Sequence, residues 1–420
     1  MESAIIAAIL ITIAFFSINF NYLNQQSLIS NFEHIDLPTS DQLVIIEIDN
    51  ESIKHFDKWP WPRYVYADLL NSLAKSNPEI VVFDIDFSTK SNMYHDLLFS
   101  NAIKEVPFSV VLSTTIVDAK KTENGDIEYV ENVPIDALKK YALLASANAL
   151  VDPSGYIFKY ATFSDNGRPS IGAILANRPN VSTEPIQIDY AIDPGYIKRF
   201  SFKDVIEGNF TEADFKDKKV LVGSTSIELG DMYTLPKYNR VPGVFVHALG
   251  YESIAAENHL THSSNQISFF IALILLLILT FFHNDKKLVL TISINLIAFA
   301  VVFMTNIILH HYYFVIFPVA IIYISIAIST TIQIVQNIRY RAHILLLEKN
   351  KNNYNKALIN QVIKENTNGI IITSLEGKIL VANKKACNIY SITAKNIKHN
   401  ESIFMFIPES RELFHNVNIL

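Results

Sequence analysis

Four long apolar runs limit what this sequence can fold into. They occupy residues 4–18, 267–282, 288–309 and 312–335. A helix that crosses the hydrocarbon core of a bilayer needs about 20 apolar residues, and about 17 is the short limit. The last two runs reach this length alone, and the first two reach it with flanking residues. We therefore predict a four-helix α membrane region, with one helix at residues 1–20 and three within 267–335.

The short loops between these runs predict their orientation, because Lys and Arg in short loops stay on the cytoplasmic side. The loop between the second and third runs contains Lys286 and Lys287, and Arg339 follows the fourth run. The loop after the third run has neither residue type. This pattern predicts a multi-pass protein of the inner (plasma) membrane, with the lipid bilayer as a partner, residues 21–266 outside the cytoplasm and both termini inside.

The first run is expected to be an uncleaved signal anchor. A cleaved signal peptide needs a charged start and a small-x-small cleavage site, and residues 1–2 and 17–21 supply neither clearly. The single cysteine, Cys387, falls on the predicted cytoplasmic side, so residues 21–266 must fold without a disulfide. They are numerous enough to do so around an apolar core. The net charge of −6 gives no reason to expect a nucleic acid partner.

Residues 21–266 alternate between strand-like and helix-like patterns. Buried strands are expected at 43–48, 80–83, 108–112, 143–147 and 220–222, and helices at 63–76, 94–104 and 134–140. Strand–helix–strand order predicts an α/β domain with a mostly parallel sheet and flanking helices on both faces. Residues 127–130, 156–163 and 186–190 are expected to be excursions from this sheet, as antiparallel strands.

Polar residues follow several of the expected strands. Ligands of parallel sheets bind beyond the carboxyl ends of the strands, and carboxylates there can hold a metal, an amine or a polar ligand. Asp, Asn and Ser at such positions also cap helices and close turns, and both interpretations remain open. The candidates are Asp49 after the first strand, Asp84 and Asp86 after the second, Ser224 after the late strand, and Asp231 and His247 beyond it.

Both tryptophans of the chain lie in the motif Trp59-Pro60-Trp61-Pro62-Arg63. The prolines restrict the backbone around two large, rigid aromatic side chains, so this segment is expected to adopt a single defined conformation. We add Trp59, Trp61 and Arg63 to the candidate ligand-binding residues. For the two tryptophans the alternative is a structural wedge against the membrane-proximal core.

Several of these motifs, in this order, resemble the CHASE2 domain, the extracytoplasmic sensory module of bacterial membrane receptors. The resemblance implies an α/β sensor and signal transduction, but it supplies no ligand. Asp57, Tyr66 and Gly250 stand where the family commonly has glycine, histidine and asparagine. The matching stretches are Ile48-Asp49-Asn50-Glu51-Ser52, the Trp-Pro motif, Val81-Val82-Phe83-Asp84-Ile85-Asp86-Phe87, Lys219-Val220-Leu221-Val222-Gly223-Ser224-Thr225, Gly230-Asp231 and Pro242-Gly243-Val244-Phe245-Val246-His247-Ala248.

Residues 336–353 are expected to form a cytoplasmic signalling helix. Ile338, Ala342 and Leu345 follow the four–three spacing of a coiled coil, which favours a homodimer. A solvated single helix remains the alternative.

Residues 354–420 resemble the start of a PAS domain, an α+β fold, of which the chain contains only part. Two short β runs flank the Glu376-Gly377 turn, and Asn383 precedes a predicted helix at 384–390. Ser374 and Ser391 replace the usual aspartate and glycine. Cys387 is predicted to pack within the helix rather than to bind a cofactor, and no cofactor is identified by the sequence.

The function predicted from these features is membrane-bound signal transduction in a bacterial receptor. An extracytoplasmic signal, of unknown chemistry, would act on the CHASE2-like domain, and the membrane helices would relay it to the PAS-like module. We find no phosphate-binding loop, phospho-accepting histidine box or cyclase motif. An output domain of histidine kinase or cyclase type, in a two-component system or a related pathway, is therefore expected after residue 420 or on a partner protein.

Two other classes of protein were weighed. A membrane-anchored, metal-dependent hydrolase could use Asp49, Asp84, Asp86 and His247 as ligands, although close ligand spacing is absent. A transporter would need polar or charged residues inside the membrane spans. Apart from several hydroxyl side chains, only Asn295 and Asn306 lie well inside them.

Overall fold

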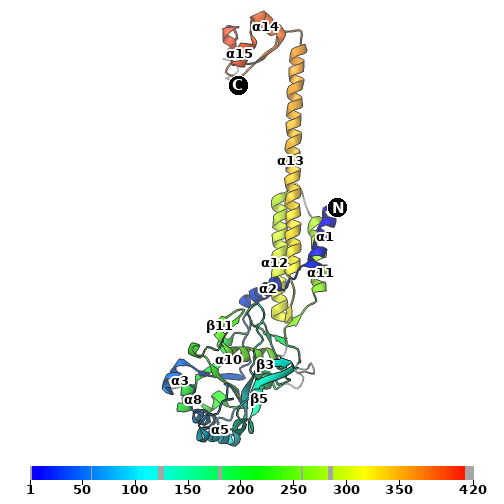
Figure 1. Ribbon diagram of the computed structural model, residues 1–420. Coiled ribbons are helices and arrows are strands. Elements are labelled where there is room, and N and C mark those ends of the chain that lie inside the picture. The colour runs from blue at the N-terminus through cyan, green and yellow to red at the C-terminus, as the bar shows by residue number, and fades with distance from the viewer. Residues whose placement is uncertain are drawn as a thin grey trace. The chain divides into compact units, whose positions relative to one another are not determined.

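The structure is a computed structural model, which describes residues 2–57, 59–121, 127–177, 182–256, 259–281 and 287–411 (Figure 1). The chain divides into two compact units. One comprises residues 1–282 and 290–330, and the other comprises residues 283–289 and 331–420.

A mostly parallel sheet forms the centre of the first unit (Figure 1). The strand order is β4-β3-β2-β9-β1-β8, with β5 paired to β3, and only the β3–β4 pair is antiparallel. The predicted α/β class is therefore confirmed. The strands are β1 (Leu43–Ile48), β2 (Ile80–Asp84), β3 (Ser109–Lys121), β4 (Ile127–Asn132), β5 (Leu143–Ser146), β8 (Lys198–Ser201) and β9 (Lys219–Ser224).

Helices cover both faces of this sheet, as predicted. In β1, Val44, Ile46 and Ile48 face one core, and Leu43 and Ile45 face the other. Successive side chains of a strand point to opposite faces, so a strand buried on both sides reads as a continuous apolar run. The helices are α3 (Asn50–His55), α4 (Arg63–Leu73), α5 (Met93–Glu105), α6 (Asp136–Lys139) and α8 (Phe202–Glu207) towards the first core, α7 (Ile171–Ala176) and α10 (Gly243–Ala255) towards the second, and the short α9 (Glu212–Phe215) before β9.

Strand β9 lies between β1 and β2, although it comes last of these strands in the chain. Ile48 is in register with Ser224, and Asp84 is in register with Gly223. The carboxyl ends of β1, β2 and β9 therefore lie side by side, as the sequence led us to expect for the residues that follow them.

Several short elements differ from the prediction. The stretches at 156–163 and 186–190 form strands of only two residues each. The polar strand β8 was not predicted, because Lys198 and Arg199 interrupt any apolar run. The short elements are β6 (Lys159–Tyr160), β7 (Ile186–Gln187), β10 (Met232–Leu235), β11 (Asn239–Pro242), β12 (Thr261–His262) and β13 (Val315–Ile316), with single 3-10 turns at Pro194–Tyr196, Ile227–Leu229 and Ile403–Met405.

Two helices among the described residues are long and apolar enough to cross a membrane, α12 (Leu288–Tyr313) and α13 (Ala320–Glu365). Helix α11 (Asn265–Phe281) is apolar but shorter. Helix α1 (Glu2–Ser17) is followed by α2 (Asn21–His34), and the pair is bent by 92°.

The fourth apolar run was predicted to form one helix from residue 312 onward, and this is wrong at its start. Helix α12 extends to Tyr313, and α13 begins only at Ala320. Between them β13 pairs with β12. Pro318 lies just before α13, where a residue without an N–H is tolerated.

The second unit contains a β-hairpin and helices. Strands β14 (Ile371–Thr373) and β15 (Ile379–Ala382) pair antiparallel around the predicted Glu376-Gly377 turn. Helix α14 (Lys384–Tyr390) follows, and α15 (Ala394–Lys398) comes next. Ile379, Ile392 and Ile403 form a small buried core, which half-buried Cys387 contacts.

Candidate functional site

Three of the predicted site residues meet in a polar cluster at the end of the sheet, where the His247 and Asp84 side chains are only 5% and 11% exposed and Asp231 stays partly exposed. Asp84 ends β2, Asp231 precedes β10, and His247 lies on α10. The Nε2 atom of His247 is 3.8 Å from Oδ2 of Asp84, and its Nδ1 atom is hydrogen-bonded to the hydroxyl of Tyr160 at 2.8 Å. We call Asp84, Tyr160, Asp231 and His247 the acid–histidine cluster.

Glycines allow α10 to approach this cluster closely. A Cβ atom on Gly243, the first residue of α10, would lie 2.3 Å from Oδ2 of Asp231. A Cβ atom on Gly223 in β9 would lie 2.7 Å from Cγ2 of Val244. Only a residue without a side chain fits where backbone and neighbour come this close, so these two glycines fix the position of α10 against the strand ends.

Burial shifts the pKa values of the cluster in opposite directions. Burial raises the pKa of Asp84 to about 7. Burial lowers the pKa of His247 to about 4, with a smaller opposing effect from the charge of Asp231. Burial, followed by the charge of Asp84, raises the pKa of Asp231. At neutral pH the imidazole is therefore neutral, and Asp84 is near the midpoint of its titration.

Tyr160 is the member of the cluster that the sequence did not single out. Its hydroxyl oxygen accepts a hydrogen bond of 2.9 Å from the Gly172 N–H. A Cβ atom on Gly172 or on Gly250 would lie 2.8 Å or 2.5 Å from its ring. No sequence pattern marks this tyrosine, because the contacts come from residues 12 and more positions away.

Two other predicted carboxylates serve local caps and turns. Asp49 accepts hydrogen bonds from the Ser52 N–H at 2.8 Å and from the Ser201 hydroxyl at 3.1 Å, and so caps α3. Asp86 accepts from the Ser88 N–H at 2.7 Å. The three acids and one histidine weighed as metal ligands are thus not brought together, and the described residues contain no group of three or more His, Cys, Asp or Glu side chains placed to hold a metal ion.

Ser224 ends β9 at the same edge of the sheet. Its Oγ atom is buried and has no hydrogen-bond partner among the residues that the structure describes. A buried hydroxyl without a partner costs free energy, which sets this position apart from the capping carboxylates.

The two tryptophans form a separate aromatic group. Trp61 is only 2% exposed and packs against Phe56 and Phe202, with ring centroids 4.9 and 4.7 Å away. Trp59 is half-buried, with its ring edge-to-face on Trp61 at 5.1 Å. Both side chains belong to the first core, which includes no described residue of α1, α2, α11, α12 or α13. The two tryptophans therefore have the structural role of the alternative interpretation, but its membrane-proximal location is wrong, because these aromatics face α3, α4 and α8.

Arg63 lies beside this aromatic group. Its guanidinium carbon is 4.5 Å from the centroid of Phe87, and Nη2 donates to the carbonyl of Thr89 at 3.2 Å. Its Nε atom is 3.8 Å from Asp96, and both side chains are about nine-tenths buried. Burial lowers the pKa of Arg63. Its contacts lie within its own face of the sheet, and none is with the acid–histidine cluster.

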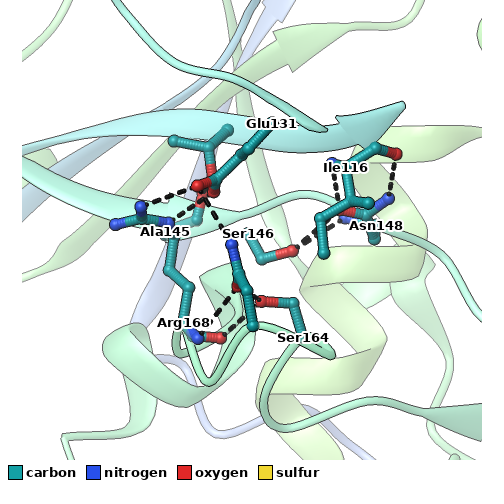
Figure 2. Close-up of polar contacts among 9 residues, drawn as sticks. Ile116, Glu131, Ala145, Ser146, Asn148, Ser164 and Arg168 are labelled. Atoms are coloured by element: carbon teal, nitrogen blue, oxygen red, sulfur yellow. Dashed lines mark hydrogen bonds and ion pairs between the residues drawn. The ribbon is translucent and has the colours of Figure 1, made fainter. Parts of the chain in front are cut away.

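A further polar network, which the sequence did not predict, anchors the β3–β4 arm (Figure 2). Arg168 donates from Nε and Nη2 to the carboxylate of Glu131 on β4, at 2.5 and 2.8 Å. Asn148 accepts from the Ile116 N–H at 2.9 Å and donates to its carbonyl at 3.1 Å. The hydrogen bond from Arg168 lowers the pKa of Glu131. Bidentate pairs of this kind fix geometry, and this one holds the arm to the loop that precedes α7.

Comparisons with known proteins identify one family. The CHASE2 domain matches residues 4–282, a range that contains the whole sheet and the acid–histidine cluster. No protein of curated function matches, and neither does any solved structure. CHASE2 is a sensory domain of signalling proteins, which agrees with the α/β architecture and the two long apolar helices. Because the match covers more than half of the chain, this chain belongs to the CHASE2 domain family.

Proposed function

We propose that this chain is a multi-pass receptor of the inner membrane, which senses an extracytoplasmic stimulus with its CHASE2 domain and relays it to the cytoplasm. In this proposal residues 21–266 lie outside, residues 1–20 and 267–335 supply four membrane helices, and both termini lie inside. Membership of a sensory family supports the sensing step, and the basic loops support the orientation.

The observation that carries the relay is a buried polar contact between the sheet domain and the apolar helix α12. His310 of α12 is fully buried, and its Nε2 atom is 3.4 Å from Oδ1 of Asp189, which is 8% exposed at its side chain. On the same helix, Asn306 donates to Oδ1 of Asn31 on α2 at 3.0 Å. A buried polar group that loses its partner costs free energy, so these contacts oppose any movement that separates the domain from the helix.

A further hydrogen bond and a shared apolar core support the same coupling. The N–H of Ala320, the first residue of α13, donates to Oδ1 of Asn24 on α2 at 3.0 Å. A ligand that favours one arrangement of this core would shift the helices with it, provided that it binds the two arrangements with different affinity. Residues of the domain and of the segments beside the helices share the core, namely Leu28, Phe32, Ile188, Tyr190, Leu249 and Ile316.

We also propose that the relay passes along α13 to a PAS-like module and to an output domain of histidine kinase or cyclase type. Helix α13 is continuous over 46 residues. Its residues Ile338 and Leu345 are exposed in the single chain, as expected of a seam that pairs two copies in a parallel coiled coil. Ile363, which continues the spacing, is buried in the single chain, so the proposed seam ends before it.

The PAS-like module is supported by the role of Asn383. Its Oδ1 atom accepts from the N–H groups of Ile370 and Ala386, and its Nδ2 atom donates to the carbonyls of Ile363 and Asn368. This one side chain therefore joins the hairpin, the start of α14 and the end of α13.

Fusions to topology reporters test the orientation. We expect alkaline phosphatase to be active when it is fused after residue 150 and inactive after residue 352, with the opposite result for green fluorescent protein. An inactive phosphatase after residue 150 contradicts the receptor.

A chimaera tests the relay. Residues 1–353 are joined to the cytoplasmic part of a histidine kinase that drives a transcriptional reporter. Asp189→Asn should change the reporter output at an unchanged level of membrane protein, because the contact with His310 is altered. Asp118→Asn, an exposed aspartate on β3, is the matched control and should leave the output unchanged. Equal outputs from the parent chimaera and both variants contradict the relay.

A further inference from the structure

A cavity of about 570 Å³ lies where the sheet domain meets the segments that flank the apolar helices. Its walls come from α2, the loop after β5, strands β6 and β7, and the residues around β12 and β13. Sites for small molecules commonly enclose about 300–1,000 Å³, so this cavity is large enough for one. It shares no residue with the acid–histidine cluster.

Part of the cavity lining is apolar and buried. Leu28 of α2, Phe158 before β6 and Ile316 of β13 all line it, and each is 6–7% exposed. Leu28 and Ile316 are also members of the core that the domain shares with the helix-flanking segments. A ligand with an apolar body would bury its surface here, with a gain of about 25 cal/mol per Å² of apolar area.

The charged side chains that line the cavity are more exposed than the buried apolar part of its lining. The carboxylate of Asp152 is already hydrogen-bonded by the N–H and the hydroxyl of Ser154, at 2.9 and 2.7 Å, and these bonds lower its pKa. Lys159 is exposed, and none of the ion pairs found between described residues includes it. Burial lowers the pKa of His262, and the charge of Lys159 lowers it further, so this histidine is neutral at neutral pH. Asp152 keeps its negative charge, because both donors are neutral, but they already occupy its Oδ1 atom. The cation that the lining offers to a ligand is the ammonium group of Lys159.

We propose that this cavity binds a small amphipathic anion, whose carboxylate or phosphate group lies beside Lys159 and whose apolar body packs on Leu28, Phe158 and Ile316. The anion is either a soluble organic acid or the headgroup region of an anionic lipid, since both present the same chemistry. The inference deepens the proposed sensor function and rests on it for the consequence of binding. Because the ligand contacts both the sheet domain and the helix-flanking segments, its binding favours one arrangement of the two.

Fluorine NMR on the full-length chain in phosphatidylcholine nanodiscs tests the proposal. The probes are 4-fluorophenylacetate and its neutral analogue 4-fluorophenylacetamide. We expect line broadening that saturates for the acid and a weaker effect for the amide. Lys159→Gln should weaken binding of the acid at least fivefold and leave the amide unchanged. Lys120→Gln, an exposed lysine on β3 that does not line the cavity, is the matched control and should change neither.

A second variant tests the location of the bound probe. Val151 lines the cavity and is 51% exposed, so Val151→Trp can fill the space without disturbing the core, and it should weaken both probes. No binding to the wild-type chain, or equal binding of the acid to wild type, Lys159→Gln and Val151→Trp, overturns the proposal. If the topology fusions behave as expected in that case, the receptor function stands and only the ligand site fails.

A comparison of two lipid compositions distinguishes the two sources of the anion. If nanodiscs that contain phosphatidylglycerol weaken binding of the acid to the wild-type chain but not the residual binding to Lys159→Gln, the headgroup occupies the same site. If binding is the same in both lipids, the ligand is a soluble acid. Either result supports an anion site at Lys159.

Discussion

Asp84 and His247 lie 3.8 Å apart inside the CHASE2 domain, and burial reverses the order of their pKa values. The pKa of Asp84 rises from 3.8 to about 7, and that of His247 falls from 6.5 to about 4. Between about pH 4 and 6.5 the folded pair holds one proton on the aspartate, and the unfolded pair holds one on the histidine. Because the number of bound protons is the same, the pair itself gives the free energy of unfolding little dependence on pH in this range.

Removal of either partner should expose opposite pH dependences. In His247→Gln, Asp84 remains, and its raised pKa means that the folded state binds the extra proton. The free energy of unfolding should then fall as the pH rises from about 4 to 7, by up to about 1.4 kcal/mol per pH unit. In Asp84→Asn, His247 remains with a lowered pKa, and the free energy of unfolding should rise with a similar slope from about pH 4 to 6.5.

Guanidinium unfolding of the detergent-solubilised chain measures these slopes. Both tryptophans lie in the CHASE2 domain, so their fluorescence reports on it alone. The difference between the two variants is the useful quantity, because contributions from titrating groups that touch neither Asp84 nor His247 cancel in it. Slopes of the same sign would show that the two side chains are not buried as a neutral pair.

The aromatic group predicts that the two tryptophans are not equivalent. Trp61→Ala should lower the free energy of unfolding by about 3–5 kcal/mol, because it removes a fully buried indole. Trp61→Phe should cost clearly less, since the indole N–H has no hydrogen-bond partner among the described residues. Trp59→Ala should also cost less, because Trp59 is half-buried. Unfolding curves followed by the fluorescence of the remaining tryptophan, or by circular dichroism, give the order, and equal costs for Trp59→Ala and Trp61→Ala would contradict it.

The sheet was predictable because its strands are buried on both faces. Continuous apolar runs marked β1, β2 and β9, and their order along the chain implied parallel pairing. The insertion of β9 between β1 and β2 is a tertiary fact that no local pattern contains. Strand β8 escaped prediction for the opposite reason, since its Lys198 and Arg199 read as a polar loop.

The candidate site was predictable only where residues follow strand ends. The sequence predicted that polar candidates gather near the strand ends, but it did not show which of them would meet. Asp231 and His247 lie with Asp84, whereas Asp49 and Asp86 cap local structure, and Tyr160 enters the cluster through long-range packing. The capping role of Asp49 could not be told from a ligand role by sequence, because both use the same side chain after the same strand.

Two departures from the family patterns have a backbone explanation. Asp57 has φ 63° and Ser391 has φ 53°, both in the left-handed region. Glycine, which the families commonly have at these positions, adopts this region without a steric cost. The glycine that the families have at these two positions therefore indicates a left-handed backbone conformation, which Asp57 and Ser391 do not reveal by their residue type.

The contact between Asp189 and His310 should make these two residues energetically coupled. His310→Asn alone removes one partner of the buried Asp189 carboxylate, which keeps the Ala191 N–H at 2.9 Å, and the loss of such a partner costs about 1–3 kcal/mol. Asp189→Asn with His310→Asn should cost less than the sum of the single variants, by about 0.5–3 kcal/mol. Denaturant unfolding of the four proteins of the cycle in one detergent gives this coupling energy. His311→Asn, on the same helix and in ring contact with Tyr312, is the matched control and should be additive with Asp189→Asn.

The proposed homodimer predicts a specific disulfide on α13. Cys387 is the only cysteine, so Cys387→Ser gives a clean background. Leu345→Cys is 65% exposed at the native residue and lies on the four–three seam, where two parallel helices bring identical positions together. It should cross-link in membranes under mild oxidation and run as a dimer on a non-reducing gel. His343→Cys, two residues earlier and about 160° around the helix at 3.6 residues per turn, should stay monomeric. If both variants cross-link equally, collision rather than a coiled coil explains the bands, and if neither does, α13 is a solvated single helix at this position.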